Sequence, residues 1–561
     1  MKRLRWQILV VLVTLVVVAG LLLSQQPAIQ QTFVAQPVSG GVYTEAVVGS
    51  LSRLNPLLDL NNAADRDVDR LLFGSLIRFD GRGVPQPDLA QSWGISVDGT
   101  LYNVSIRPDA VWHDGEPVTS DDVIFTLGLL MGSVSAYPED VKEMWKTVQV
   151  ERLNDKTIKF TLPEPFAPFL DYLTFGLLPK HLLESTPPEG LQDAEFNIRP
   201  VGSGPYKFDH LLVEGGQITG IVLTAFEDYY AQAPFIQQVV FRYYPTSREA
   251  LTAYQQGEVL GVSQITPDVL DEALEEPNLS VHTGRLPEMS LVLLNLNNPE
   301  TAFLQETEVR RALMTGLNRQ RLVDTLLQGQ AIVADGPLFP GTWAYFDEIE
   351  RITYDPEAAT EMLIAAGYTI PAAGGEVREK EGAALSFTLL HPDDELHTAI
   401  AQSIQGDWAK LGVRVNLQAV PYDQLFFDHL VTRQYQAALV DLNLARSPDP
   451  DPYPFWHQAE ATGGQNYSQW DNQSASEFLE QARVEVDPAA RLRLYHNFQV
   501  VFSQELPSLP LFYPVYSFGV DSQVQGVQMP PLFEPADRFA TINTWFLVTR
   551  RSVEPTATAG P

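Results

Sequence analysis

An apolar run at the N-terminus is the first feature of the hydropathy pattern. Lys2, Arg3 and Arg5 precede 16 mainly apolar residues from Ile8 to Leu23. Such a charged start before a hydrophobic core is typical of an export signal, and its basic residues stay in the cytoplasm. The run is slightly short of the ~17 to 25 residues of a spanning helix, but no Ala-x-Ala cleavage pattern follows. We expect residues 1–25 to remain as an anchor, with cleavage as the alternative.

Helical periodicity dominates the middle of the chain. In YDPEAATEMLIAAGY, Asp355 is placed to cap a helix, Pro356 to begin it and Gly367 to end it. A second helix, with apolar residues at Ile400 and Ile404, precedes Gly412. Strand-like segments at 384–390 and 413–420 flank it, and a strand, helix, strand order predicts a parallel sheet.

A different periodicity indicates a second kind of layer. LYNVSIRPDAVWHDG, at 101–115, alternates polar and apolar residues as half-buried antiparallel strands do. The stretches at 26–39 and 550–561 show no periodicity, so we expect a flexible tether and a disordered tail there. The pattern therefore predicts α/β layers with an antiparallel part.

Composition excludes several classes of function. With 561 residues, the chain is long enough for two or more packed units. Its 70 acidic and 37 basic residues give a net charge of −33, which disfavours nucleic acid and anionic membranes as partners. Cysteine is absent from the sequence, so disulfides, thiolate nucleophiles, Cys-ligated zinc and thioether lipid anchors are excluded.

Enzymatic motifs are also missing. The sequence contains no Gly-x-Ser-x-Gly elbow and no His-Glu-x-x-His pair, which argues against the corresponding hydrolases and metalloproteases. A pair of glycosidase carboxylates cannot be recognised by motif in so acidic a chain. An extracellular hydrolase is therefore left as an alternative, and it is the order of the motifs that are present that leads us to expect no catalysis and no cofactor.

Several motifs in order resemble one family. SRLNPLLD near the start, LLFGSLIRFDGRGVPQPDLAQSWGISVDGTLYNVSIRPDAVWHDGEPVTSDDVIFTL, GSGPYKF at 202–208 and ELPSLPLFY near the end are collinear with the family 5 extracytoplasmic solute-binding proteins of ABC importers. The resemblance extends roughly from Gly40 to Thr549. It implies a two-lobed α/β fold of the periplasmic-binding-protein type (type II, cluster C).

The resemblance also implies a domain layout. Lobe I would comprise 40–290, with an extra antiparallel subdomain at about 65–200, and would be completed by a return segment at 511–549. Lobe II would be 291–510, with crossings near Leu291 and Leu511. In such a hinged fold, a ligand that contacts both lobes only when they are closed shifts the population towards that state.

The stretch LARSPDPDPYPFW carries the main candidate site. In peptide-binding members of the family, a Trp-x-x-Asp-x-x-Asp-Pro segment binds the free amino group of the peptide through its first aspartate. Aligning that segment on Asp449 to Asp451 places Asn443 at the tryptophan and Arg446 at this aspartate, with Leu444 and Ala445 between them. A guanidinium favours a carboxylate, phosphate or sugar hydroxyl over an ammonium. The alternatives are an arginine in a structural ion pair and, for the Asp-Pro repeat, a calcium loop or a simple turn.

Aromatic side chains complete the candidate set. Trp343, Tyr345 and Tyr422 lie in segments expected near the cleft, where they would stack on a ligand, although an aromatic residue taken alone is more often part of the core than a ligand contact. The cluster His391 to His397 has the side chains of a metal site, but its position at a helix start favours capping, and we expect no bound metal.

Together these features predict a monomeric substrate-binding component of an ABC importer. Its partners would be a small solute such as a peptide or oligosaccharide, the permease subunits, and the membrane through the N-terminal helix. We expect it in the periplasm or tethered to the outer face of the cytoplasmic membrane. The alternative function is a ligand-binding sensor that uses the same hinged two-lobed fold without transport.

Overall fold

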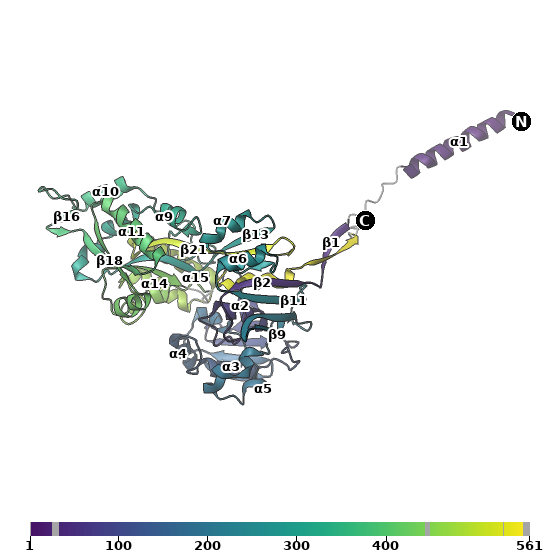
Figure 1. Cartoon of the computed structure of the whole chain (residues 1–561), viewed down its shortest axis with the longest axis horizontal. Helices are drawn as coiled ribbons and strands as arrows, with labels where there is room; N and C mark the ends of the chain where they lie inside the picture. The colour runs from purple at the N-terminus through teal and green to yellow at the C-terminus, as the bar shows by residue number, and fades with distance from the viewer. Residues whose placement is uncertain (1, 25–32, 444–448, 531, 554–561) are drawn as a thin grey trace. The chain divides into compact units, whose positions relative to one another are not determined.

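The computed structural model describes residues 2–24, 33–443, 449–530 and 532–553 (Figure 1). The chain forms two units, a terminal unit of Met1–Ser39 with Val548–Pro561, and a main unit of Gly40–Leu547.

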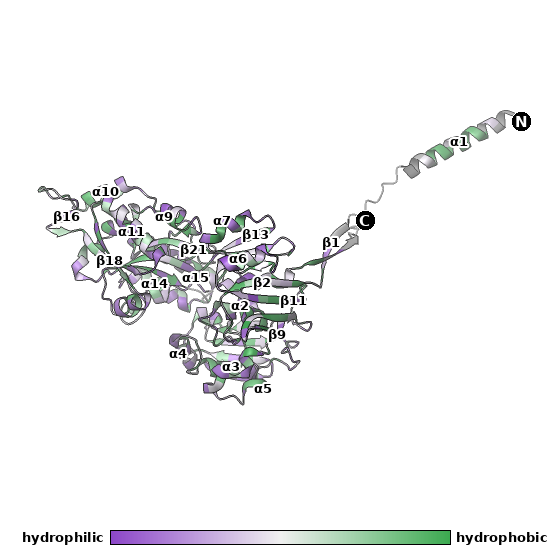
Figure 2. Cartoon of the chain, in the orientation of Figure 1, coloured by the Kyte–Doolittle hydropathy of each residue, from purple (hydrophilic) through white to green (hydrophobic). Residues whose placement is uncertain are grey.

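The terminal unit contains one helix and one two-stranded ribbon. Helix α1 (Lys2–Ser24) carries the apolar run (Figure 2). Strand β1 (Phe33–Val38) pairs antiparallel with β22 (Val548–Val553). This pairing differs from the tether and tail expected at 26–39 and 550–561, because a ribbon between segments so far apart in sequence leaves no local periodicity. Within the part of the chain that the structure describes, no helix is both long and apolar enough to cross a membrane.

The main unit contains two lobes, each built on a sheet. In lobe I, β2 pairs parallel with β11 and β12, and β9 and β10 extend the sheet as an antiparallel edge. The strands of this sheet are β2 (Val42–Val48), β9 (Tyr206–Glu214), β10 (Gln217–Ala225), β11 (Gln238–Tyr244), β12 (Gly261–Val262) and β13 (Leu279–Arg285).

Lobe II is built on a second, mixed sheet. Strand β18 lies between β19 and β20 and is parallel to both, whereas β14 pairs antiparallel with β20. The strands are β14 (Glu288–Leu294), β15 (Ala331–Val333), β18 (Ser386–Pro392), β19 (Arg414–Val420) and β20 (Ala437–Asn443). The short pair β16 (Glu379–Lys380) and β17 (Ala383–Ala384) lies apart from it.

The long strand β21 (Ser508–Asp521) belongs to both sheets. Its first half pairs with β14 and β15, and from Val515 onwards it pairs with β13 and then β12. The chain also passes from lobe I to lobe II between β13 and β14, at residues 286–287. These two passages lie a few residues away from Leu291 and Leu511.

An antiparallel subdomain is inserted into lobe I. Its sheet has the order β5 (Ala90–Ile95), β6 (Leu101–Ile106), β8 (Thr157–Thr161) and β7 (Gln149–Asn154). A small hairpin of β3 (Ile77–Phe79) and β4 (Pro85–Pro87) precedes it. Figure 1 shows helices α3 and α4 beside this sheet.

The remaining helices connect these strands. Those of lobe I are α2 (Ala63–Leu72), α3 (Ser120–Leu130), α4 (Glu139–Thr147), α5 (Lys180–Leu183), α6 (Ser247–Gln255), α7 (Pro267–Glu275), η1 (Ala167–Leu173), η2 (Pro188–Asp193), η3 (Glu195–Ile198) and η7 (Pro535–Thr544). Those of lobe II are η4 (Pro299–Gln305), α8 (Thr307–Thr315), α9 (Arg319–Leu326), α10 (Pro356–Ala365), α11 (Glu395–Lys410), α12 (Tyr422–Gln424), η5 (Leu425–Leu430), α13 (Tyr453–Trp456), η6 (Gln458–Ala461), α14 (Gln473–Val484) and α15 (Pro488–Glu505).

Local sequence signals explain several of these elements. Strands β18 and β19 are parallel on either side of α11 in sequence, which confirms the predicted strand, helix, strand unit. Asp355 caps α10 by accepting the N–H of Ala358, and Gly367 follows with φ +95°, as predicted. In GSGPYKF, a Cβ on Gly202 would lie 1.8 Å from the carbonyl oxygen of Leu72, so this motif is a close backbone contact rather than a phosphate loop.

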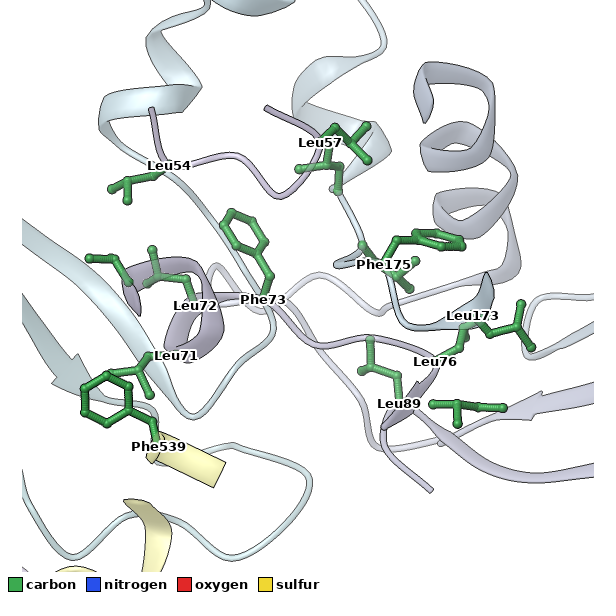
Figure 3. Close-up of a cluster of buried hydrophobic side chains, with 14 of the residues drawn as sticks. Leu54, Leu57, Leu71, Leu72, Phe73, Leu76, Leu89, Leu173, Phe175 and Phe539 are labelled. Carbon is green, nitrogen blue, oxygen red and sulfur yellow. The ribbon is translucent and has the colours of Figure 1, made fainter. Parts of the chain in front are cut away.

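The core of lobe I is closed by the return segment. Figure 3 shows Phe539 of η7 beside Leu71 of α2, within a cluster of leucine and phenylalanine side chains. In the same region the guanidinium of Arg538, fully buried, donates to the carboxylates of Glu45 and Asp67. These contacts bind β2, α2 and η7 together, and α2 and the residues just before η7 form part of the wall described next.

Candidate functional site

A cleft of about 480 Å³ is lined by residues of both lobes. Lobe I contributes residues from the segments 56–79, 130–145, 166–176 and 533–537. Lobe II contributes Asn443, Asp449, Asp451, Pro454, Phe455, Gln465 and Arg483. A volume of this size falls in the ~300 to 1,000 Å³ range of small-molecule sites.

Aromatic side chains form much of the lobe I wall. Trp145 of α4 is buried and meets Phe175 edge to face, with ring centroids 6.1 Å apart. Phe166 and Tyr172 pair at the ends of η1, with centroids 5.8 Å apart. The helix α4 presents Trp145 because its apolar positions face the subdomain core, and the ring reaches from that core to the cleft. These surfaces suit the apolar part of a solute.

The opposite part of the lobe I wall is charged. Arg66 and Arg70 lie one turn apart on α2 and pair with Glu534 and Asp537, at 3.2 and 3.0 Å. Burial raises the pKa of Asp537, and the adjacent Arg70 opposes this shift. Among the described residues that line the cleft, eight are acidic and four are arginines, so the lining carries an excess of negative charge. The acidic residues are Asp59, Asp69, Asp140, Asp171, Asp449, Asp451, Glu534 and Asp537.

The Asp-Pro repeat forms the lobe II side. Both carboxylate oxygens of Asp449 accept hydrogen bonds from Arg491 of α15, one at 2.7 Å. Asp451 accepts the N–H of Tyr453 and pairs with Arg483 of α14 at 2.7 Å. The prolines and these paired carboxylates make a braced turn. Among the described residues, no cluster of three or more His, Cys, Asp or Glu is placed to hold a metal ion.

The two lobes touch at the edge of the cleft. The backbone N–H of Asp449 donates to Oδ2 of Asp171 in η1 at 2.8 Å. The guanidinium of Arg483 lies 5.8 Å from the ring centroid of Phe166, and the N–H of Trp343 donates to the carbonyl of Arg82 at 2.8 Å. Burial raises the pKa of Asp171 well above its usual value, and the neighbouring Asp449 adds to the shift. The structure is therefore a conformation in which both lobes cover this end of the cleft.

The residues singled out from the sequence lie in different places. Asn443 lines the cleft and donates to Oε1 of Glu288 at 2.8 Å. Leu444, Ala445 and Arg446 lie outside the described residues.

The three aromatic candidates do not line this cavity. Trp343 lies behind its lobe II wall, where it packs on Tyr495 and on the guanidinium of Arg491. Tyr345 is half-buried against lobe II, and Tyr422 is 56% exposed. The Trp343 ring thus packs on the same Arg491 that holds Asp449.

The cluster from His391 to His397 contains the residue that caps α11. Asp394 caps α11 by accepting the N–H of His397 at 2.9 Å, as the helix-start pattern predicted. The His397 ring also lies 2.6 Å from Asp394 and 3.0 Å from Asp441. Burial opposes the charged form of His397, but the two aspartates outweigh it and raise its pKa.

Several residues at the cleft carried no signal in the sequence. Asp171, Trp145 and Arg483 each lie in an ordinary amphipathic or turn segment. The contact from Asp171 to Asp449 joins positions 278 residues apart, so no local spacing could reveal it.

Two α/β lobes, joined by two strand passages and facing each other across a cleft, define the class of two-lobed solute-binding folds. Residues 84–465 match the family model described as "Bacterial extracellular solute-binding proteins, family 5 Middle". The chain therefore belongs to the family 5 bacterial extracellular solute-binding proteins, as its motifs indicated.

Known relatives are similar in sequence to this chain over nearly its whole length. The oligopeptide-binding protein AppA of Bacillus subtilis is 26% identical over 91% of this chain and 92% of its own. The dipeptide-binding protein of Escherichia coli is 24% identical over 89% of this chain and 95% of its own. The structure of the Bacillus subtilis AppA in complex with a nonapeptide superposes with a TM-score of 0.67 at 25% identity, covering 91% of this chain and 100% of that one.

Proposed function

We propose that the protein captures a peptide or peptide-like solute in the cleft, closes its lobes around it and delivers it to the permease of an ABC importer. The observation that carries this proposal is that one cleft is lined by both lobes, whose contact includes the hydrogen bond from Asp449 to Asp171. A ligand that fills this space is bound more tightly when the lobes are closed, so it shifts the population towards closure.

The chemistry of the cleft supports a peptide-like ligand. Aromatic walls suit apolar side chains, while paired charges and an excess of carboxylates suit amide and ammonium groups. The names of the two relatives point to the same ligand class. The expected contact of Arg446 with an anionic group of the ligand remains a prediction.

The location follows from the N-terminus. We propose that residues 1–25 direct export and remain as a tether that holds the monomeric binding unit outside the cytoplasmic membrane. The support is the basic start before the apolar run, whose described side chains are exposed in α1. Alkaline carbonate extraction of membranes and N-terminal sequencing of the recovered protein test this: a chain released into the soluble fraction and beginning after residue 25 would contradict the tether.

Ligand binding is tested by calorimetry and thermal denaturation of the full chain in mild detergent. The probes are trialanine, a pool of random tripeptides, maltotriose and the nickel complex of histidine. A probe at 100 times its dissociation constant should stabilise the fold by about 2.7 kcal/mol. Stabilisation by a peptide probe is the expected result, whereas stabilisation by maltotriose or the nickel complex alone would overturn the peptide assignment.

Transport is tested separately from binding. Cells that lack the gene should lose uptake of the radiolabelled probe that binds in vitro, and the restored gene should return it. Unchanged uptake in the deletion strain, together with binding in vitro, would favour the sensor reading.

A further inference from the structure

Asp171 occupies an unusual electrostatic position at the edge of the cleft. Its Oδ2 accepts the N–H of Asp449 at 2.8 Å, while its buried Oδ1 has no hydrogen-bond partner among the described residues. No lysine, arginine or histidine of the described chain lies within ion-pair distance of it. A carboxylate thus lines the cleft and faces the opposite lobe without a counter-ion of its own.

The nearest positive charges already have partners. Arg491 is held by both oxygens of Asp449, and Arg483 by Asp451. Two arginines are therefore matched by two aspartates, and Asp171 is the third carboxylate of the group. Asp449, Arg491 and Asp451 are the charges that act most strongly on it. When all three carboxyls are ionised, these described residues therefore carry one negative charge more than positive.

Closure of the lobes makes this charge costly. Asp171 belongs to lobe I, and the segment that covers it belongs to lobe II. When the lobes separate, water can solvate the carboxylate; when they meet, that solvation is lost. Burying an ionised carboxylate without a cation is strongly unfavourable. The empty closed state is therefore penalised until a positive charge arrives.

The surroundings of Asp171 indicate which cation fits. Tyr172 follows Asp171 in η1 and packs on Phe166, the residue before that helix, and Trp145 and Phe175 line the same cleft. Aromatic faces attract organic cations and pack against an alkyl chain. The indole N–H of Trp145 is also buried without an acceptor among the described residues, so a carbonyl or carboxylate oxygen of a ligand would satisfy it.

We propose that Asp171 is a specificity-determining residue that receives an ammonium or guanidinium group of the solute, and that this group permits full closure of the lobes. The inference rests on the proposed function and deepens it: among peptide-like solutes, those with a basic side chain are preferred.

Ligand preference is tested with matched probes. Ala-Lys-Ala and Ala-norleucine-Ala differ only in the side-chain ammonium, and Ala-Arg-Ala supplies a guanidinium. Because hydrogen bonds to charged groups contribute about 1.5 to 3 kcal/mol, the full chain should bind the lysine and arginine probes about tenfold or more tightly than the norleucine probe. Asp171→Asn should reduce this ratio to near one.

The variant has a matched control. Asp193→Asn removes the same charge from an exposed position on η2 that is not part of the lining of the cleft. It should keep the wild-type ratio. Equal affinities for the lysine and norleucine probes in the wild type, or an unchanged ratio in Asp171→Asn, would overturn the proposal.

Closure is measured without any ligand. Because the sequence has no cysteine, spin labels can be placed at Val97→Cys on lobe I and Val484→Cys on lobe II, both exposed. Gly99 and Val486 lie in contact here, so the closed state gives a short distance by pulsed electron paramagnetic resonance. Asp171→Asn should raise the short-distance fraction of the empty protein at pH 7.5, and Asp193→Asn should not.

The two experiments separate the inference from the function on which it rests. If no peptide probe binds, the proposed ligand class fails, and the empty-protein distances still decide whether Asp171 opposes closure. A distance distribution in Asp171→Asn identical to that of the wild type would overturn the inference, because it would mean that a proton or the local dipoles already neutralise the carboxylate.

Discussion

Replacing Arg538 with methionine should test how the return segment holds the cleft wall. The Arg538 side chain is fully buried and donates to Glu45 at 2.6 and 3.0 Å and to Asp67 at 2.6 and 2.7 Å. A fifth hydrogen bond, 3.0 Å long, reaches the carbonyl of Pro535. Methionine fills similar volume and removes all five donors.

The expected loss follows from what the substitution leaves behind. Glu45 is fully buried and Asp67 is 5% exposed, so Arg538→Met strands two carboxylates in the core of lobe I. Removing one partner of a buried ion pair typically costs about 3 to 5 kcal/mol. We expect a loss of this size in the free energy of unfolding of lobe I.

The loss should depend on pH. Burial raises the pKa of Glu45 even in the wild type, and Arg538 limits that rise. Without the arginine, the pKa of Glu45 in the folded state rises further. The free energy of unfolding therefore falls as the pH rises above the pKa that Glu45 has in the unfolded chain, because folding then buries an ionised carboxylate. The variant should therefore be closest to the wild type near pH 5 and fall furthest below it near pH 8.

Urea unfolding at pH 5 and pH 8, followed by circular dichroism, measures both effects. The triple variant Arg538→Met, Glu45→Gln, Asp67→Asn removes the stranded charges and should recover much of the loss at pH 8. A loss of free energy of unfolding below about 1 kcal/mol, or the same loss at both pH values, would refute the reasoning that Arg538 stabilises lobe I by compensating the buried charges of Glu45 and Asp67.

Two further predictions concern the contact between α2 and GSGPYKF. Gly202→Ala should lower the melting temperature strongly, because its Cβ would clash with the carbonyl of Leu72, whereas Gly94→Ala, which meets nothing within 4 Å, should change it little; similar melting temperatures would contradict the contact. His113 accepts the N–H of Gly202 and donates to the carbonyl of Gly204, and burial lowers its pKa to about 4. Stability from this group should be complete above about pH 6.5 and be lost as the pH falls towards 4, so the pH dependence of unfolding should flatten in His113→Asn over that window.

The helices and strands that could be predicted from the sequence are those specified by residues within the segment itself, such as a cap, a proline or a terminal glycine. The helix after Asp355 has a cap, a proline at its first position and a terminal glycine, and each of them takes the predicted place in the structure. The parallel pair β18 and β19 followed from alternating apolar segments around a helix. The ribbon of β1 with β22 had no such cause, since its hydrogen bonds join the two ends of the chain.

The site was predictable only where the sequence departed from a known pattern. The Asp-Pro repeat stood out by composition, and Asp449 and Asp451 do line the cleft, but as carboxylates paired with arginines of α14 and α15. Aromatic candidates could not be sorted, because Trp343 behind the wall and Trp145 within it have the same local setting of apolar neighbours. What distinguishes a cleft residue is what lies opposite it. For Asp171 that is a backbone amide of the other lobe and, among the described residues, no cation within ion-pair distance, a relation that exists only once both lobes have folded and met.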